Sequence, residues 1–119
     1  MERFQFGSEV AFAPRQDILE GVTIAPLTPP IAAGSPVQCA IFRLGAGGGI
    51  GRHPALVPQI FAVLEGTGTI AGTDGVNEDI RAGEAVFWAE GEEHEASSAS
   101  GLTALVVEGP ELRPFERRA

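Results

Sequence analysis

Short apolar runs separated by turn residues are the feature that most constrains the fold of this chain. Sixteen glycines and nine prolines occur among its 119 residues, while strong helical periodicity is scarce. Apolar and β-branched runs with turns this frequent are typical of antiparallel sandwiches and barrels. The length suits a single domain with one hydrophobic core. We therefore predict an all-β fold, an antiparallel β-barrel, with strands at 37–44, 59–64, 67–71, 77–81, 85–88, 95–98 and 103–108.

The chain divides into three segments by composition. Residues 1–36 are rich in proline and small residues and are expected to form an irregular arm. One short strand is predicted in this arm at 21–25, and a short surface helix is a further candidate at 15–20. Such an arm either lies across the barrel or serves as a dimerisation segment that gives a strand to a second subunit. The barrel is expected to span 37–109, and 110–119 to form a C-terminal tail.

Glycine marks two turns of different kinds. Asp74-Gly75 is a strong hairpin signal, because the tight turn it favours needs positive φ, so the flanking runs are expected to pair. The stretch 45–51 is glycine-rich, yet it does not satisfy the dinucleotide fingerprint, and Pro54 and Pro58 follow it instead of a helix. We interpret this stretch as a flexible loop that reverses the chain.

Acidic residues outnumber basic ones by sixteen to eight, for a net charge of −8, and all eight basic residues are arginines. A chain of this charge is repelled by a phosphate backbone, so nucleic acid is not an expected partner. Without lysine the chain forms neither a Schiff base nor a P-loop. Binding or conversion of a small molecule remains as the expected class of function.

The expected location is the cytoplasm, with no membrane partner. No stretch approaches the roughly 20 apolar residues that cross a bilayer, and the N-terminus lacks the pattern of a signal peptide. Cys39 is the single cysteine, so no internal disulfide forms, in agreement with a reducing compartment. Its place in an apolar run favours a buried, structural thiol over a nucleophile.

The only two histidines occupy equivalent local positions. His53 follows the glycine loop and precedes the predicted strand at 59–64, and His94 follows a glycine turn and precedes the strand at 95–98. In an antiparallel barrel, strand ends of this kind can converge on one pocket. His94 also lies within the acidic run 90–95, which we interpret as a solvated loop whose carboxylates would raise the pKa of an exposed histidine.

The histidines belong to two segments that resemble the motifs of the cupin family. The segment 47–66 resembles the first motif, G-x5-H-x-H-x3-E-x6-G, and the segment 83–98 resembles the second, G-x5-P-x-G-x2-H-x3-N. Six residues are in register with these motifs: Gly47, His53, Gly66, Gly83, Gly91 and His94. The resemblance implies a small, often dimeric β-barrel of the double-stranded β-helix or jelly-roll type. It also implies a divalent metal held by three histidines and a glutamate.

Four motif positions carry other residues, so two of the four family ligands are retained. The second histidine, the glutamate, the proline and the asparagine are replaced by Ala55, Gln59, Ala89 and Ser98. In one reading, His53, Gln59 and His94 form a weakened metal site that binds Zn, Fe, Mn or Ni and leaves coordination positions open for water and substrate. The other is metal-free, with the same three side chains hydrogen-bonded to an organic ligand. The loss of the carboxylate favours the second use.

Aromatic residues are the candidate ligand contacts. Alternation along the strand at 59–64 places Phe61 on the same face as Gln59. Phe87 and Trp88 are adjacent in a strand and point to opposite faces, so only one of them enters the pocket. We take Phe61 and Trp88 as candidate substrate-binding residues, and an apolar outer face as support for a homodimer.

Three functions stay open at this point. The first is a metal-free binding protein for a small molecule, and the second is a metal-dependent enzyme such as a dioxygenase. The third is an isomerase or a polyketide-cyclase-like enzyme that uses the same pocket. The replacement of two family ligands by Ala55 and Gln59 favours binding, and no residue is assigned a catalytic role.

Overall fold

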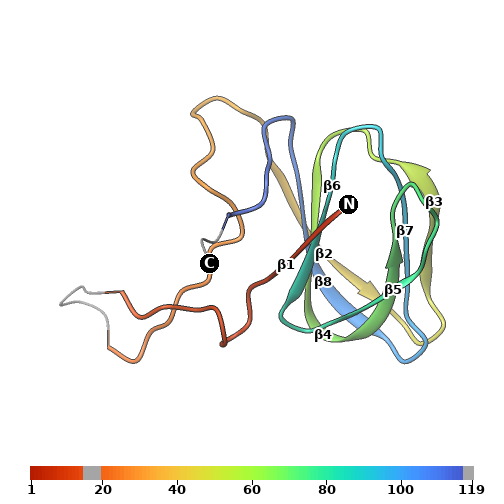
Figure 1. Cartoon of the computed structure of the whole chain (residues 1–119), viewed down its shortest axis with the longest axis horizontal. Helices are drawn as coiled ribbons and strands as arrows, with labels where there is room; N and C mark the ends of the chain where they lie inside the picture. The colour runs from red at the N-terminus through yellow and green to blue at the C-terminus, as the bar shows by residue number, and fades with distance from the viewer. Residues whose placement is uncertain (15–19, 117–119) are drawn as a thin grey trace.

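The computed structural model describes residues 1–14 and 20–116, and within these ranges the chain contains eight strands and no helix (Figure 1). The predicted all-β, antiparallel fold is therefore confirmed. No helix among the described residues is long and apolar enough to cross a membrane. The strands are β1 (Glu2–Gln5), β2 (Gln38–Leu44), β3 (Gly49–Pro54), β4 (Gln59–Ala71), β5 (Glu78–Arg81), β6 (Glu84–Trp88), β7 (Glu93–Ser97) and β8 (Leu102–Glu108).

The strands form two facing layers that share β4. The larger layer has the order β2-β8-β4-β6-β1, and the smaller has the order β3-β7-β4-β5. The two layers enclose the barrel interior, seen end-on on the right of Figure 1. The sheet does not close, because β2 and β3 each pair along one side only among the described strands.

Strand β4 is one continuous strand where the sequence predicted two. Its first half pairs with β6 and β8, and its second half pairs with β5 and β7. The register with β8 shifts between Val63 and Glu65, and Gly66 has a φ of 85°. The predicted turn at Glu65-Gly66 is therefore wrong. It is a bulge within a paired strand, and the bulge turns β4 from one layer into the other.

The turn at Asp74-Gly75 is the expected hairpin, whereas the glycine loop is shorter than expected. Across the hairpin Ile70 is opposite Glu78, and Gly75 has a φ of 70°. The reversal at the glycine stretch ends by Gly48, and the chain from residue 49 onward forms β3, paired with β7. The sequence did not predict β3, because its glycines and proline are poor strand formers.

Apolar side chains from both layers fill the interior. Trp88 and Phe61 are the largest of the fully buried side chains. The neighbouring Phe87 faces outward, as alternation along β6 predicts. The interior cluster consists of Leu44, Phe61, Val63, Ile70, Ile80, Val86, Trp88, Ala96, Leu102, Ala104 and Val106.

The N-terminal arm covers the outer face of the larger layer, on the left of Figure 1. It begins with β1, which pairs with β6 of the same chain, and later places Leu27 and Ile31 against a buried cluster that includes Ile60. The strand expected at 21–25 is wrong, because Ile24 makes only one isolated bridge, to Phe12. The alternative helix over 15–20 falls almost entirely outside the described residues. Use of the arm by a second subunit stays a prediction.

Cys39 is exposed, contrary to the expectation of a buried thiol. It lies on β2, at the edge of the larger layer, where only one neighbouring strand flanks it. Its side chain shares the outer face of β2 with Ile41, which is 47% exposed. An apolar sequence run thus does not guarantee burial on both faces of an edge strand.

Gly66→Ala should destabilise the chain far more than Gly91→Ala. Both glycines have positive φ, at 85° and 79°, which costs an alanine about 1–2 kcal/mol. At Gly66 an added Cβ would also overlap the backbone of Gly101 and Leu102, whereas at Gly91 it would meet nothing within 4 Å. Urea denaturation of both variants measures the difference. Equal losses in the free energy of unfolding would contradict this account of the bulge.

Candidate functional site

The two histidines face each other across a pair of strands. His53 of β3 is directly opposite His94 of β7, and their ring centroids lie 4.4 Å apart. Both residues are inside strands, and the predicted positions ahead of the strands are wrong, because β3 was missed and β7 starts earlier than expected. Strand register, rather than the convergence of loops, brings the two imidazoles together.

A backbone carbonyl fixes the protonated nitrogen of each imidazole. His53 Nδ1 lies 2.7 Å from the carbonyl oxygen of Gly51, and His94 Nδ1 lies 3.1 Å from that of Glu92. A carbonyl oxygen only accepts hydrogen bonds, so Nδ1 carries the proton in each neutral ring. The Nε2 lone pair of both histidines is therefore available as an acceptor or as a metal ligand.

Trp88 packs against the inner histidine and is itself in contact with Phe61. Trp88 of β6 stacks on His94 with centroids 4.4 Å apart, and Phe61 of β4 lies 5.9 Å from Trp88. His94 is only 3% exposed, whereas His53 is on the surface. Trp88 Nε1 is buried and has no hydrogen-bond partner in the structure, which is unusual because a buried donor normally finds one.

Glu108 is a polar neighbour of the site that the sequence reasoning missed. Gln59 donates from Nε2 to Glu108 Oε1, and both residues lie at the end of the interior face of their strands. Glu108 follows Ala104 and Val106 at a spacing of two, and both of those are buried in the interior. That alternation was the available signal, because it places Glu108 on the inner face.

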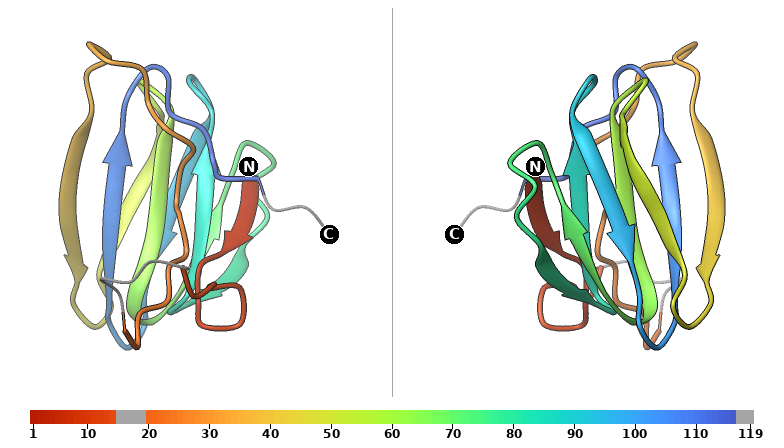
Figure 2. Two further views of the ribbon diagram at one scale, coloured as in Figure 1. Left: turned by 90° about the vertical axis from the view of Figure 1, so that its left-hand side faces the viewer. Right: turned by 90° about the vertical axis from the view of Figure 1, so that its right-hand side faces the viewer.

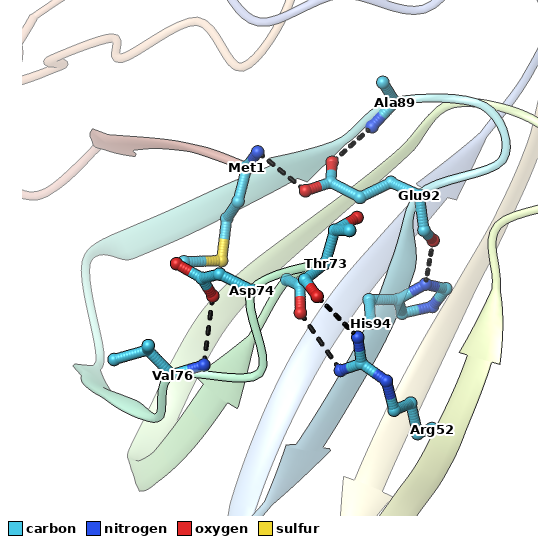
Figure 3. A network of polar contacts seen from close by, with 9 residues as sticks. Met1, Arg52, Thr73, Asp74, Val76, Ala89, Glu92 and His94 are labelled. Carbon is cyan, nitrogen blue, oxygen red and sulfur yellow. Dashed lines mark hydrogen bonds and ion pairs between the residues drawn. The ribbon is translucent and has the colours of Figure 1, made fainter.

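A polar network holds the strand ends around the histidines (Figure 3). Glu92 accepts from the Met1 amino group at 2.7 Å and from the Ala89 backbone N–H at 3.0 Å. Arg52 donates to the backbone carbonyls of Gly72 and Thr73. The interpretation of 90–95 as a solvated loop is thus wrong for Glu92, whose carboxylate is largely buried in an ion pair.

Burial lowers the pKa of His94 from its ordinary value of 6.5. Desolvation is the largest cause, and the backbone hydrogen bond with Glu92 raises the pKa but does not offset it. The nearby His53 lowers it further, while Glu92 and Glu108 act in the opposite direction. His94 is therefore neutral at pH 7, because its burial outweighs the carboxylates around it.

The largest groove that we describe lies away from the histidines. It measures about 750 Å³ and is lined by β4 and β5 residues such as Thr69 and Arg81, together with Arg3. No imidazole or aromatic ring lines it. The candidate site therefore rests on the histidine pair and on the unpaired Trp88 N–H, not on this groove.

A family model described as a cupin domain matches residues 40–108, which is more than half of the chain. The chain belongs to the cupin family. Both histidines, Gln59 and Trp88 lie within the matched range. A search of curated proteins gives no match.

Solved structures with the same fold include proteins of different kinds. An RmlC-like cupin from Shewanella frigidimarina is 20% identical, with a TM-score of 0.59, over 62% of this chain and 66% of its own. A predicted oxalate decarboxylase from Thermotoga maritima is 25% identical, with a TM-score of 0.55, over 65% of each chain. Salicylate 1,2-dioxygenase from Pseudoaminobacter salicylatoxidans, solved as adducts with gentisate, is 17% identical, with a TM-score of 0.57, over 60% of this chain and 19% of its own. This cupin thus spans two thirds or less of the length of these three proteins.

The donor set of this cupin is poor for a metal ion. His53 and His94 supply two imidazole nitrogens, Ala55 supplies no donor, and the amide of Gln59 is hydrogen-bonded to Glu108. Within the described residues, no group of three or more His, Cys, Asp or Glu side chains is placed to share a metal ion. The remaining donors are thus two imidazoles and the neutral amide oxygen of Gln59, a weaker set than three histidines and a glutamate.

The stability of this cupin should fall as the pH is lowered from 7.5 to 5.5, and His94→Gln should reduce that dependence. The folded state holds the pKa of His94 below 6.5, so the unfolded state takes up the proton first and gains stability as the pH falls. The contribution of His94 is complete above pH 6.5 and is lost as the pH falls through the interval between 6.5 and the lowered folded value. Urea midpoints at the two pH values, compared between His94→Gln and the unaltered chain, measure the effect. An unchanged pH dependence in His94→Gln would contradict the assignment.

Proposed function

We propose that this cupin binds a small, neutral organic molecule where His53 and His94 meet, with Gln59 as a further polar contact. Unpaired hydrogen-bonding capacity at this position supports the proposal. The two Nε2 atoms are acceptors, and Trp88 Nε1 is a buried donor without a partner. A ligand with a hydroxyl group and a nearby carbonyl oxygen would pair with both kinds of atom, which offsets the cost of leaving them unpaired.

The charges around the histidines favour a neutral ligand over an anion. Glu92 and Glu108 are close enough to His94 to affect its pKa, and each carboxylate would repel an anionic ligand. Arg52, next to His53 in the sequence, is occupied by the carbonyls of Gly72 and Thr73. Burial keeps His94 itself neutral at pH 7. An anion would thus find little compensating positive charge.

Apolar side chains would hold the body of the ligand. Trp88 stacks on His94 and Phe61 contacts Trp88, and Val63 and Val106 belong to the same buried cluster as these two aromatic residues. Binding sites for small molecules are typically apolar with a few convergent polar groups. An aromatic ketone with an adjacent hydroxyl group matches this combination. The ligand enters from the side of His53, which is the exposed member of the pair.

The single tryptophan provides a direct test. We expect 2′-hydroxyacetophenone to change the fluorescence of Trp88 saturably, because the ring stacked on His94 reports on any ligand bound there. Salicylate has the same scaffold with a carboxylate, and acetophenone lacks the hydroxyl group. Both should bind more weakly, by about tenfold or more, which corresponds to about 1.4 kcal/mol. Equal or tighter binding of salicylate would contradict a site for neutral ligands.

Variants then place the binding. His94→Ala and Gln59→Ala should weaken the response to 2′-hydroxyacetophenone, whereas Asn77→Ala, an exposed amide in the β4–β5 turn, should leave it unchanged. Thermal unfolding of each variant checks that the fold is retained. A response that persists in both His94→Ala and Gln59→Ala would show that the ligand binds elsewhere.

A metal-dependent enzyme is the second candidate, and the tautomers of the histidines support it. Ligating histidines usually donate Nδ1–H to a backbone carbonyl, as His53 and His94 do here. The fold is also that of a salicylate dioxygenase and of a predicted oxalate decarboxylase. An ion bound through His53, His94 and the Gln59 oxygen would supply Lewis-acid or dioxygen chemistry. The reaction would be that of a dioxygenase, an isomerase or a polyketide-cyclase-like enzyme.

Restoring the two lost ligands separates the two candidates. Ala55→His with Gln59→Glu should bind Zn²⁺ at least about tenfold more tightly than the natural chain, because it adds an imidazole and a carboxylate. Calorimetry and elemental analysis of protein without a histidine tag measure this gain. A tightly bound, near-stoichiometric metal in the natural chain that His53→Ala and His94→Ala both remove would favour the enzyme over the metal-free proposal.

A further inference from the structure

The outer face of the smaller layer carries the groove of about 750 Å³ that lies away from the histidines. The right-hand view of Figure 2 looks onto this layer from outside, and the described part of the N-terminal arm beyond β1 lies behind it. Ile70 and Ile80 belong to the interior cluster, so their strand neighbours Thr69 and Asp79 face outward. The groove and the interior are therefore on opposite sides of the smaller layer, and a ligand in the groove would be independent of one bound at the histidines.

Unequal side-chain lengths hollow out this face. Strands β4 and β7 contribute the short side chains of Thr67, Thr69 and Ser97 to the lining. Strand β5 contributes the long side chain of Arg81, and Arg3 of β1 reaches across to a backbone carbonyl of β5. Long side chains beside short ones leave a depression, and the short ones here carry hydroxyl groups.

Two rows of hydrogen-bonding side chains cross the groove. Ser97 of β7, Thr69 of β4 and Asp79 of β5 are register partners and form the first row. Thr67 and Arg81, also opposite each other, form the second. Adjacent strands are about 4.8 Å apart, so the first row extends about 10 Å, which is the length of a disaccharide. A carboxylate accepts hydrogen bonds, a guanidinium donates them and a hydroxyl does both, so the two rows offer every kind of partner.

The charges that line the groove cancel. Arg3 and Arg81 are accompanied by the carboxylates of Asp79 and Glu84. Arg3 is held in place by hydrogen bonds to Glu84 at 3.2 Å and to the backbone carbonyl of Asp79 at 2.6 Å, whereas the side chain of Arg81 is 75% exposed. A lining with no net charge favours neither an anion nor a cation, and no aromatic ring is present to hold an apolar ligand. The lining therefore suits a neutral molecule that is rich in hydroxyl groups.

We propose that this groove binds a neutral sugar of about disaccharide size. Neighbouring hydroxyls of a pyranose ring would donate to the carboxylate of Asp79 and accept from the guanidinium of Arg81, because each of these planar groups pairs with two adjacent hydroxyls. The hydroxyls of Thr69 and Ser97 are already bonded to each other at 2.8 Å, so they are ordered before a ligand arrives, and each has capacity for a further hydrogen bond. Such ordering lowers the entropic cost of binding.

Titration of the full chain with maltose, cellobiose and lactose, followed by amide NMR, tests this proposal. We expect at least one of the three sugars to shift the amides of Thr69, Asp79 and Arg81 saturably and to leave that of His94 unchanged. Glucuronate should bind no more tightly than glucose, because the groove has no excess positive charge for the added carboxylate. The absence of a saturable shift with all three disaccharides up to their solubility limits would overturn the proposal, and so would a preference for glucuronate.

Variants of the charged pair then locate the sugar. Asp79→Ala and Arg81→Ala should each raise the dissociation constant by about tenfold or more, because each removes a two-pronged partner of the hydroxyls. Glu90→Ala and Arg113→Ala are the matched controls: they remove the same charges from exposed positions that do not line the groove, and they should leave binding unchanged. Thermal unfolding of each variant checks that the fold is retained. Equal binding by all four variants would overturn the proposal, because the sugar would then lie elsewhere on the molecule.

Discussion

The structure depends on a single constraint, the membership of β4 in both layers. One half of β4 is opposite β6 and β8, and the other half is opposite β5 and β7. In the first half Gln59 is opposite Trp88, and in the second half Ala71 is opposite Glu95, the neighbour of His94. The bulge near Gly66 turns the strand between the layers, so it also sets how Trp88 and His94 approach each other.

The contact between Trp88 and His94 then decides the chemistry of the site. Stacking in the interior removes His94 from water, and burial keeps its ring neutral at pH 7. A neutral ring with Nδ1 bonded to a carbonyl presents an acceptor at Nε2. Together with the unpaired Trp88 N–H, this gives a site suited to hydroxyl and carbonyl groups. Gln59 adds an amide group to the site. This amide donates a hydrogen bond to the carboxylate of Glu108, which lies on the neighbouring strand β8.

The sequence predicted the fold class and those strands whose apolar and polar residues alternate clearly. The strand predictions were wrong where local residue preferences oppose the β-strand pairing seen in the structure. The hairpin at Asp74-Gly75 and the outward Phe87 follow from local rules. Strand β3 was missed because its glycines and proline indicate a loop, and only its pairing with β7 makes it a strand. The exposure of Cys39 depends on where the sheet ends, which no local pattern contains.

The sequence predicted the residues of the candidate site but not how they are paired in space. The spacing of the cupin motifs identified His53, Gln59 and His94. Alternation placed Phe61 on the same face as Gln59, but it left open which of Phe87 and Trp88 faces the interior; the structure places Trp88 there. The direct pairing of the two histidines required the register of β3 against β7, and the role of Glu108 required that of β8 against β4. These registers are set by tertiary contacts, so sequence spacing alone does not define them.

Nitrogen-15 NMR of the two imidazoles, with and without 2′-hydroxyacetophenone, tests the central claim most directly. We expect the Nδ1 of each ring to carry the proton that is donated to the backbone carbonyl, and both Nε2 resonances to shift when the ligand donates its hydroxyl group. A ring protonated at Nε2 in His94, or Nε2 resonances that stay unchanged at saturating ligand, would contradict the claim that the histidine pair is the binding site.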